Sequence, residues 1–161
     1  MTEVLFSHMT EKPTVVALID AAEAEFAIHG IEGSSLRAIM RAADTDTASI
    51  HYHFGNRERL ARQVLDRILT PLNIRRVALL DNAVQETIGP IPLAAIIEAL
   101  ARPDIEASLA LDERGEGRAR PIGAIYVRPS NFVKSLVEER FRPVADKFMP
   151  HLILAVPDVP G

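Results

Sequence analysis

Apolar residues recur three and four positions apart along most of the 161-residue chain, and strict alternation of apolar with polar residues is rare. Spacings of three and four place side chains on one face of an α-helix, whereas alternation is typical of a half-buried strand. Hydrophobic residues make up 48% of the chain, enough to bury a core. The sequence therefore predicts an all-α fold.

Composition narrows the function classes. The chain has no cysteine, which excludes disulfides, thiolate metal sites and cysteine nucleophiles. No apolar run approaches the roughly 18 residues of a membrane span, and the N-terminus lacks the pattern of a secretory signal. We therefore expect a cytoplasmic protein without membrane association. Because the net charge is −4, contact with nucleic acid requires a local basic patch.

Capping residues divide the N-terminal part into four predicted helices, over 14–29, 36–43, 47–53 and 57–69. The residues that suit helix ends and turns are Gly30, Ser34 or Ser35, Asp44, Asp46 and Asn56. In the third helix, Ile50 and Phe54 lie four positions apart and predict its buried side.

Thr70 and Pro71 suit the start of a new helix or a kink, and they mark the predicted domain boundary. Further helices are predicted over 71–87, 92–111 and 129–156, and Pro143 should kink or divide the last of them. The predicted organisation is a flexible leader over 1–13, an N-terminal domain over 14–69 and a helical C-terminal domain over 70–161.

The first three helices form the pattern of a helix-turn-helix: a long helix followed by two short helices that a tight turn joins. With Ile50 and Phe54 inward, a rotation of about 100° per residue directs Ala48 and Tyr52 outward. Small and hydrogen-bonding side chains surround them, which can approach base edges in a major groove. The third helix is thus predicted to read DNA.

The segments "AAEAEFAIHGIEGSSLRAIMRAAD" and "ASIHYHFGNRERL" carry a resemblance to a known family. Residues 14–69 resemble the N-terminal DNA-binding domain of TetR-family transcriptional regulators. The resemblance implies a homodimeric repressor that binds a double-stranded DNA operator and responds to a small apolar ligand in its C-terminal helices. Family members usually continue beyond the point where this sequence stops, and their dimer interface lies there.

By position, the resemblance implies roles for nine residues in DNA binding. Ser35 and Arg37 would contact the DNA backbone or nearby bases. Groove contacts would come from Thr47, Ala48, Ser49 and His51, and phosphate contacts from Tyr52, His53 and Arg57. Residues 37–67 contain six arginines and four carboxylates, which makes this segment weakly basic. This balance predicts a modest nonspecific affinity for DNA with a shallow salt dependence.

Other interpretations of these residues are weaker. His51 and His53 lie two positions apart, so they point to different sides of a helix and make a poor metal pair. Glu23 and Glu25 have the same spacing and form no acid/base pair, while Ser34 and Ser35 lack a partner base. We predict no enzyme activity, catalytic residue, metal or cofactor. The remaining alternative is an all-helical ligand- or protein-binding module without DNA binding.

Overall fold

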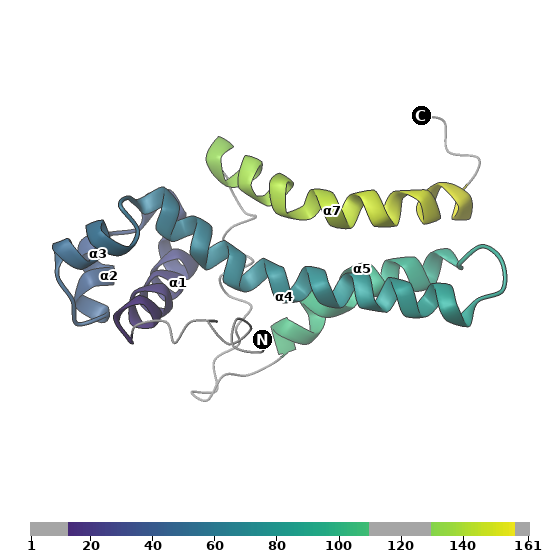
Figure 1. Cartoon of the computed structure of the whole chain (residues 1–161), viewed down its shortest axis with the longest axis horizontal. Coiled ribbons are helices and arrows are strands. Elements are labelled where there is room, and N and C mark those ends of the chain that lie inside the picture. Colours follow the sequence, from purple (N-terminus) through teal and green to yellow (C-terminus); the bar gives the residue numbers. More distant parts are fainter. Residues whose placement is uncertain (1–12, 110–129, 157–161) are drawn as a thin grey trace, which may run out of the picture. The chain divides into compact units, whose positions relative to one another are not determined.

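The computed structural model describes residues 13–109 and 130–156, and the predicted leader lies almost entirely outside these ranges. Within them all regular structure is helical, which confirms the all-α prediction (Figure 1). The helices are α1 (Pro13–Gly33), α2 (Leu36–Ala42), α3 (Thr47–His53), α4 (Arg57–Glu86), α5 (Leu93–Leu109) and α7 (Asn131–Ala155). None of these combines the length and apolar character needed to cross a lipid bilayer.

The chain forms two compact units that divide between Val64 and Leu65, inside α4. This structural division lies close to the predicted boundary at residue 70. The roles assigned to 14–69 and 70–161 concern function, however, so they stay predictions.

The first unit contains α1, α2, α3 and the beginning of α4. α1 contacts α2 and α3, and the two short helices contact each other. Its buried apolar residues come from every one of these helices and include Leu18, Phe26, Ile39, Ile50 and Leu60. Since most of them follow the predicted three-and-four spacing, the first unit closes on the core that the sequence indicates.

Gly30 interrupts α1. Its φ of 71° and ψ of 169° are non-helical, and the chain makes one further turn to Gly33. This left-handed φ agrees with the predicted helix end at Gly30. The observed loop is shorter than the predicted one, because it begins only after Gly33. Ile31 is buried there, and the buried Ser34 donates its hydroxyl to the Ile31 carbonyl at 2.6 Å.

The predicted end of a helix at residue 69 is wrong, because α4 continues through Pro71 to Glu86. Proline removes one backbone donor and crowds the preceding turn, but Leu69 and Leu72 on either side of it are buried. Tertiary packing therefore outweighs the local signal. The last helix is likewise undivided, with Pro143 and Pro150 inside α7.

The second unit packs α5 and α7 together with the later part of α4. Its apolar core consists of Leu80 from α4, Ile91, Ile96 and Ala99 around α5, and Val144 and Phe148 from α7. These three helices therefore share one hydrophobic core.

A nearly buried guanidinium lies within this unit. The Arg76 side chain is only 7% exposed. Its Nε donates to the Leu100 carbonyl at 3.0 Å, and Nη1 donates to Asn73 Oδ1 at 2.6 Å. Nη2 pairs with Asp104, and the ring centre of Phe141 lies 5.6 Å from the guanidinium carbon. All three helices of the unit thus contribute to holding one cation.

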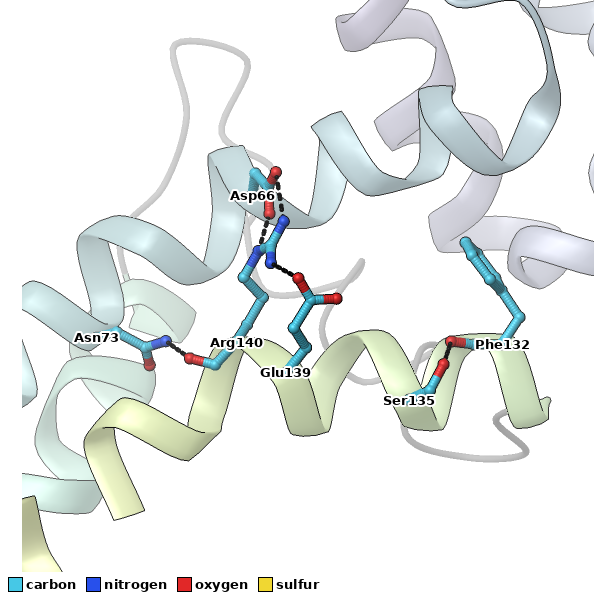
Figure 2. Close-up of polar contacts among 6 residues, drawn as sticks. All are labelled: Asp66, Asn73, Phe132, Ser135, Glu139 and Arg140. Carbon is cyan, nitrogen blue, oxygen red and sulfur yellow. Dashed lines mark hydrogen bonds and ion pairs between the residues drawn. The ribbon is translucent and has the colours of Figure 1, made fainter. Parts of the chain in front are cut away.

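A second polar cluster joins α4 to α7 (Figure 2). Arg140 pairs with both carboxylate oxygens of Asp66 and donates to Glu139 at 2.7 Å. Hydrogen bonding to Asp66 raises the pKa of the Arg140 guanidinium above its already high value. Asn73 Nδ2 donates to the Arg140 carbonyl at 2.9 Å. This cluster fixes α7 against α4 through backbone as well as side-chain atoms.

The two carbonyls that α4 engages occupy equivalent positions. Leu100 lies three residues before Pro103, and Arg140 lies three residues before Pro143. A proline inside a helix lacks the N–H that would bond the carbonyl four residues before it, and it crowds the preceding turn. Side chains of α4 thus bond a carbonyl in the turn before each proline, next to the carbonyl that the proline leaves without a helical donor.

We expect Asp104→Ala to lower the free energy of unfolding by about 2 kcal/mol or more, because it leaves the Arg76 cation nearly buried without its anion. Glu106→Ala is the matched control on α5, since Glu106 pairs with Arg102 at an exposed site, where such pairs contribute under about 1 kcal/mol. Urea unfolding of both variants measures the difference. Equal losses would contradict the role of Asp104.

Candidate nucleic-acid interface

The third helix, α3, has one buried and one exposed side. Ile50 and Phe54 are 2% and 3% exposed. On the opposite side Ala48 is exposed, and Tyr52 is 78% exposed. The structure therefore leaves an outer surface of α3 open, as the helical spacing predicted.

The turn between α2 and α3 is tight. The Ala43 N–H donates to the Ile39 carbonyl at 2.9 Å and the Thr45 N–H to the Met40 carbonyl at 3.0 Å. Asp44 takes a left-handed φ of 49°, a conformation that aspartate adopts more readily than most non-glycine residues. The turn that the sequence predicted at Asp44 is thus confirmed.

Gly55 closes the end of α3. With φ at 74°, its N–H donates to the carbonyls of Ile50 and His51, both at 3.1 Å. A Cβ added there would lie 3.6 Å from the nearest atom, Arg59 Nη1, which is ordinary contact. Glycine is therefore favoured here by backbone conformation rather than by lack of space. The next residue, Asn56, caps α4 by accepting the Arg59 N–H at 2.9 Å.

Three rings lie at the C-terminal end of α3. The His51 ring is exposed, and its Nδ1 lies 3.0 Å from the Gly55 carbonyl oxygen. The Tyr52 and His53 rings meet edge to face with centres 4.9 Å apart, and His53 contacts Phe54 in the same manner at 6.3 Å. Packing on Phe54 thus orders the half-buried His53, while Tyr52 reaches into solvent.

Ser35 is held at the beginning of α2 from two directions. Its hydroxyl accepts the Ala38 N–H at 3.3 Å, which confirms the predicted cap, and its own N–H donates to Glu25 Oε1 at 2.9 Å. The contact with Glu25, which spans ten residues, was not predicted. Arg37 follows in the first turn and is exposed. Both predicted DNA contacts of α2 are therefore accessible.

Arg57 has a contact that the sequence did not indicate. Its Nη1 donates to the Glu32 carbonyl at 3.0 Å, at the end of α1. A cation there neutralises the carbonyl end of a helix. Arg57 thus joins the start of α4 to the end of α1, and its predicted phosphate contact would use the remaining N–H groups of its guanidinium.

The other two predicted residues, Thr47 and Ser49, lie within the first half of α3. Their side chains fall outside the described part of the structure. Their predicted groove contacts, like the DNA roles of the other seven residues, stay predictions.

The charge of the first unit is not that of a general polyanion binder. Residues 13–64 hold five arginines against seven carboxylates. In the described ranges no group of three or more histidine, aspartate or glutamate side chains is arranged to hold a metal ion. The accessible surface of α2 and α3 therefore offers mainly hydrogen-bonding groups and a few cations.

Comparison with known proteins agrees with this geometry. Residues 18–64 match the family described as bacterial regulatory proteins, tetR family. This match confirms the predicted resemblance, and with the exposed α3 it identifies the class of protein as a DNA-binding transcriptional regulator. Over these residues the chain is similar to the TetR family.

Solved structures extend the likeness in fold beyond this segment. SmeT in its complex with triclosan superposes with a TM-score of 0.62 at 18% identity, covering 91% of this chain and 67% of that one. A protein from Pseudomonas aeruginosa PAO1, described as a transcriptional regulator, gives 0.60 at 19% identity, covering 98% and 72%. No curated protein matches. The fold of such regulators thus includes both units of this chain.

We expect Gly55→Ala to cost about 1 kcal/mol of stability, because alanine disfavours the left-handed conformation. Gly33→Ala is the matched control, since Gly33 lacks a positive φ and an added Cβ would meet only His29 Cβ at 3.8 Å. Thermal unfolding of both variants tests this. A loss of stability in Gly33→Ala alone would contradict it.

Proposed function

We propose that this protein is a transcriptional repressor that binds an operator through α2 and α3 and releases it when a small apolar ligand binds the second unit. The observation that carries the DNA-binding part is the exposure of Ala48 and Tyr52 above the buried pair Ile50 and Phe54. The repressor acts on DNA in the cytoplasm.

The predicted residues support two kinds of DNA contact. Ala48 is small and exposed, which suits close approach to a thymine methyl group or another base edge. Hydrogen-bond donors for phosphates come from Ser35 and Arg37 at the start of α2, and from Tyr52, His53 and Arg57. Phosphate contacts would fix the register of α3 in the groove, and base contacts would select the sequence.

The proposed operator is a palindrome bound by a homodimer. Two copies present two α3 helices, and half-sites on one face of the duplex recur about 34 Å apart. A ligand that favours a different separation of these helices lowers operator affinity in proportion to its differential affinity for the two arrangements.

Support for the ligand comes from one similar structure and from the second unit. SmeT was solved with triclosan, and its fold covers nearly all of this chain. Moreover α4 begins in the first unit and ends in the second. A ligand that alters the packing of α5 and α7 on α4 would therefore act on a helix that also carries Arg57.

Operator binding is tested with genomic fragments that the wild-type protein selects. We expect Ala48→Glu to weaken binding by at least about 10-fold, because a carboxylate in the groove faces acceptors and phosphates. Tyr52→Ala should weaken it less, by the loss of about one contact. Ala24→Glu places the same change on an exposed position of α1 and should leave binding unaltered.

Gel mobility shift and fluorescence anisotropy measure these affinities. Failure of the wild-type protein to prefer any fragment would reject the regulator and favour a ligand- or protein-binding module without DNA binding.

Ligand response is tested with triclosan and a panel of other small apolar compounds. We expect at least one compound to raise the melting temperature, because binding to the folded state alone stabilises it. The same compound should release the operator fragment over the same concentration range. A compound that stabilises the protein but leaves its DNA affinity unchanged would contradict ligand-controlled repression.

A further inference from the structure

The orientation of the His51 ring fixes the hydrogen-bonding character of its outer edge. Nδ1 lies 3.0 Å from the Gly55 carbonyl oxygen. A carbonyl oxygen can only accept, so Nδ1 carries the proton and donates. In a neutral imidazole the other nitrogen then has no hydrogen and is an acceptor. Neutral His51 therefore offers an acceptor, Nε2, on an exposed ring.

The partner in this hydrogen bond is fixed by the backbone at the end of α3. Gly55 is held by its φ of 74° and by the bonds from its N–H to Ile50 and His51. His51 belongs to the helix that these bonds close, so its ring and the Gly55 carbonyl are parts of one hydrogen-bonded helix end. Gly55 is thus a positioning residue for the histidine, and it acts through the tautomer of His51.

An acceptor at this place excludes the most common DNA partner. Phosphate oxygens also only accept, so neutral His51 with Nδ1 engaged cannot bond a phosphate. The donors that a major groove presents are the exocyclic amino groups of adenine, N6, and cytosine, N4. Guanine and thymine present acceptors at the corresponding positions.

We infer, on the basis of the DNA-binding role proposed above, that His51 is a specificity-determining residue whose Nε2 accepts a hydrogen bond from the amino group of an adenine or cytosine in the operator. The same position would read DNA differently with tyrosine, whose hydroxyl can also donate. His51 thereby selects against guanine and thymine at one base of each half-site.

The tautomer is measured first, in the free protein and without DNA. Long-range ¹H–¹⁵N spectra of histidine-labelled protein at about pH 8, above the usual histidine pKa of about 6.5, distinguish a protonated nitrogen from an unprotonated one. His51→Phe assigns the signals. We expect the proton on Nδ1 and none on Nε2. A proton on Nε2 overturns the inference, whatever the DNA results.

The base contact is measured on the selected operator by removing amino groups one at a time. Replacing adenine with 2-aminopurine moves the amino group out of the major groove, and replacing cytosine with 2-pyrimidinone deletes it. At one position we expect the wild-type protein to lose about 5- to 10-fold in affinity, the size of one net hydrogen bond. Whether the adenine or the cytosine replacement causes this loss shows which of the two bases donates to His51.

The variant His51→Phe, tested on the same modified operators, completes a double-mutant cycle. It keeps a ring of similar size but lacks the acceptor, so we expect the loss at that position to fall below about 2-fold. His29→Phe, on the exposed side of α1, is the control and should show the wild-type loss. Equal losses in the wild-type protein and His51→Phe at every position overturn the inference, as does a doubly protonated His51 in the spectrum of the complex.

These outcomes separate the specificity of His51 from the proposed function. A wild-type protein without any sequence preference would reject operator binding itself. If the protein binds its operator but the loss on removing each amino group is the same with and without His51, the proposed repressor function stands. Only the specificity role of His51 is then rejected.

Discussion

The burial of Ile50 and Phe54 is the constraint on which the proposed DNA-binding surface depends. α3 has only seven residues, and an isolated helix of that length is not stable in water. It persists because two side chains pack into the first unit and Gly55 closes its end. The same packing decides which side of α3 stays exposed, so the core of the unit determines the orientation of the residues that we propose to face the groove.

Local sequence signals predicted much of this unit. Features that depend on a few neighbouring residues can be recognised in the sequence. They are the bounds of α3, the cap at Ser35, the turn at Asp44 and the cap at Asn56. The contacts of Glu25 with Ser35 and of Arg57 with the Glu32 carbonyl were not predicted. They join residues 10 and 25 positions apart, and only the folded arrangement brings these together.

The second unit shows the limit of local signals more clearly. Pro71 is a strong indicator of a helix boundary, yet α4 continues through it, since the residues around it are buried. Arg76 resembles any other arginine in the sequence, but α4, α5 and α7 surround it with acceptors and an aromatic ring. Its role follows from contacts 24 and 28 residues away on α5. Periodicity therefore predicted the helices, and the polar contacts that select their packing required the structure.

The charge of the first unit bears on how it would recognise DNA. With five arginines against seven carboxylates, residues 13–64 as a whole do not attract phosphates, and Arg57 already donates to the Glu32 carbonyl. Nonspecific affinity comes mainly from counterion release by cations, so we expect it to be small for such a surface. A larger share of the discrimination between sequences then falls to hydrogen bonds at base edges. In the proposed mode of recognition, the tautomer of the exposed His51 would consequently have more influence on operator choice than it would on a strongly basic domain.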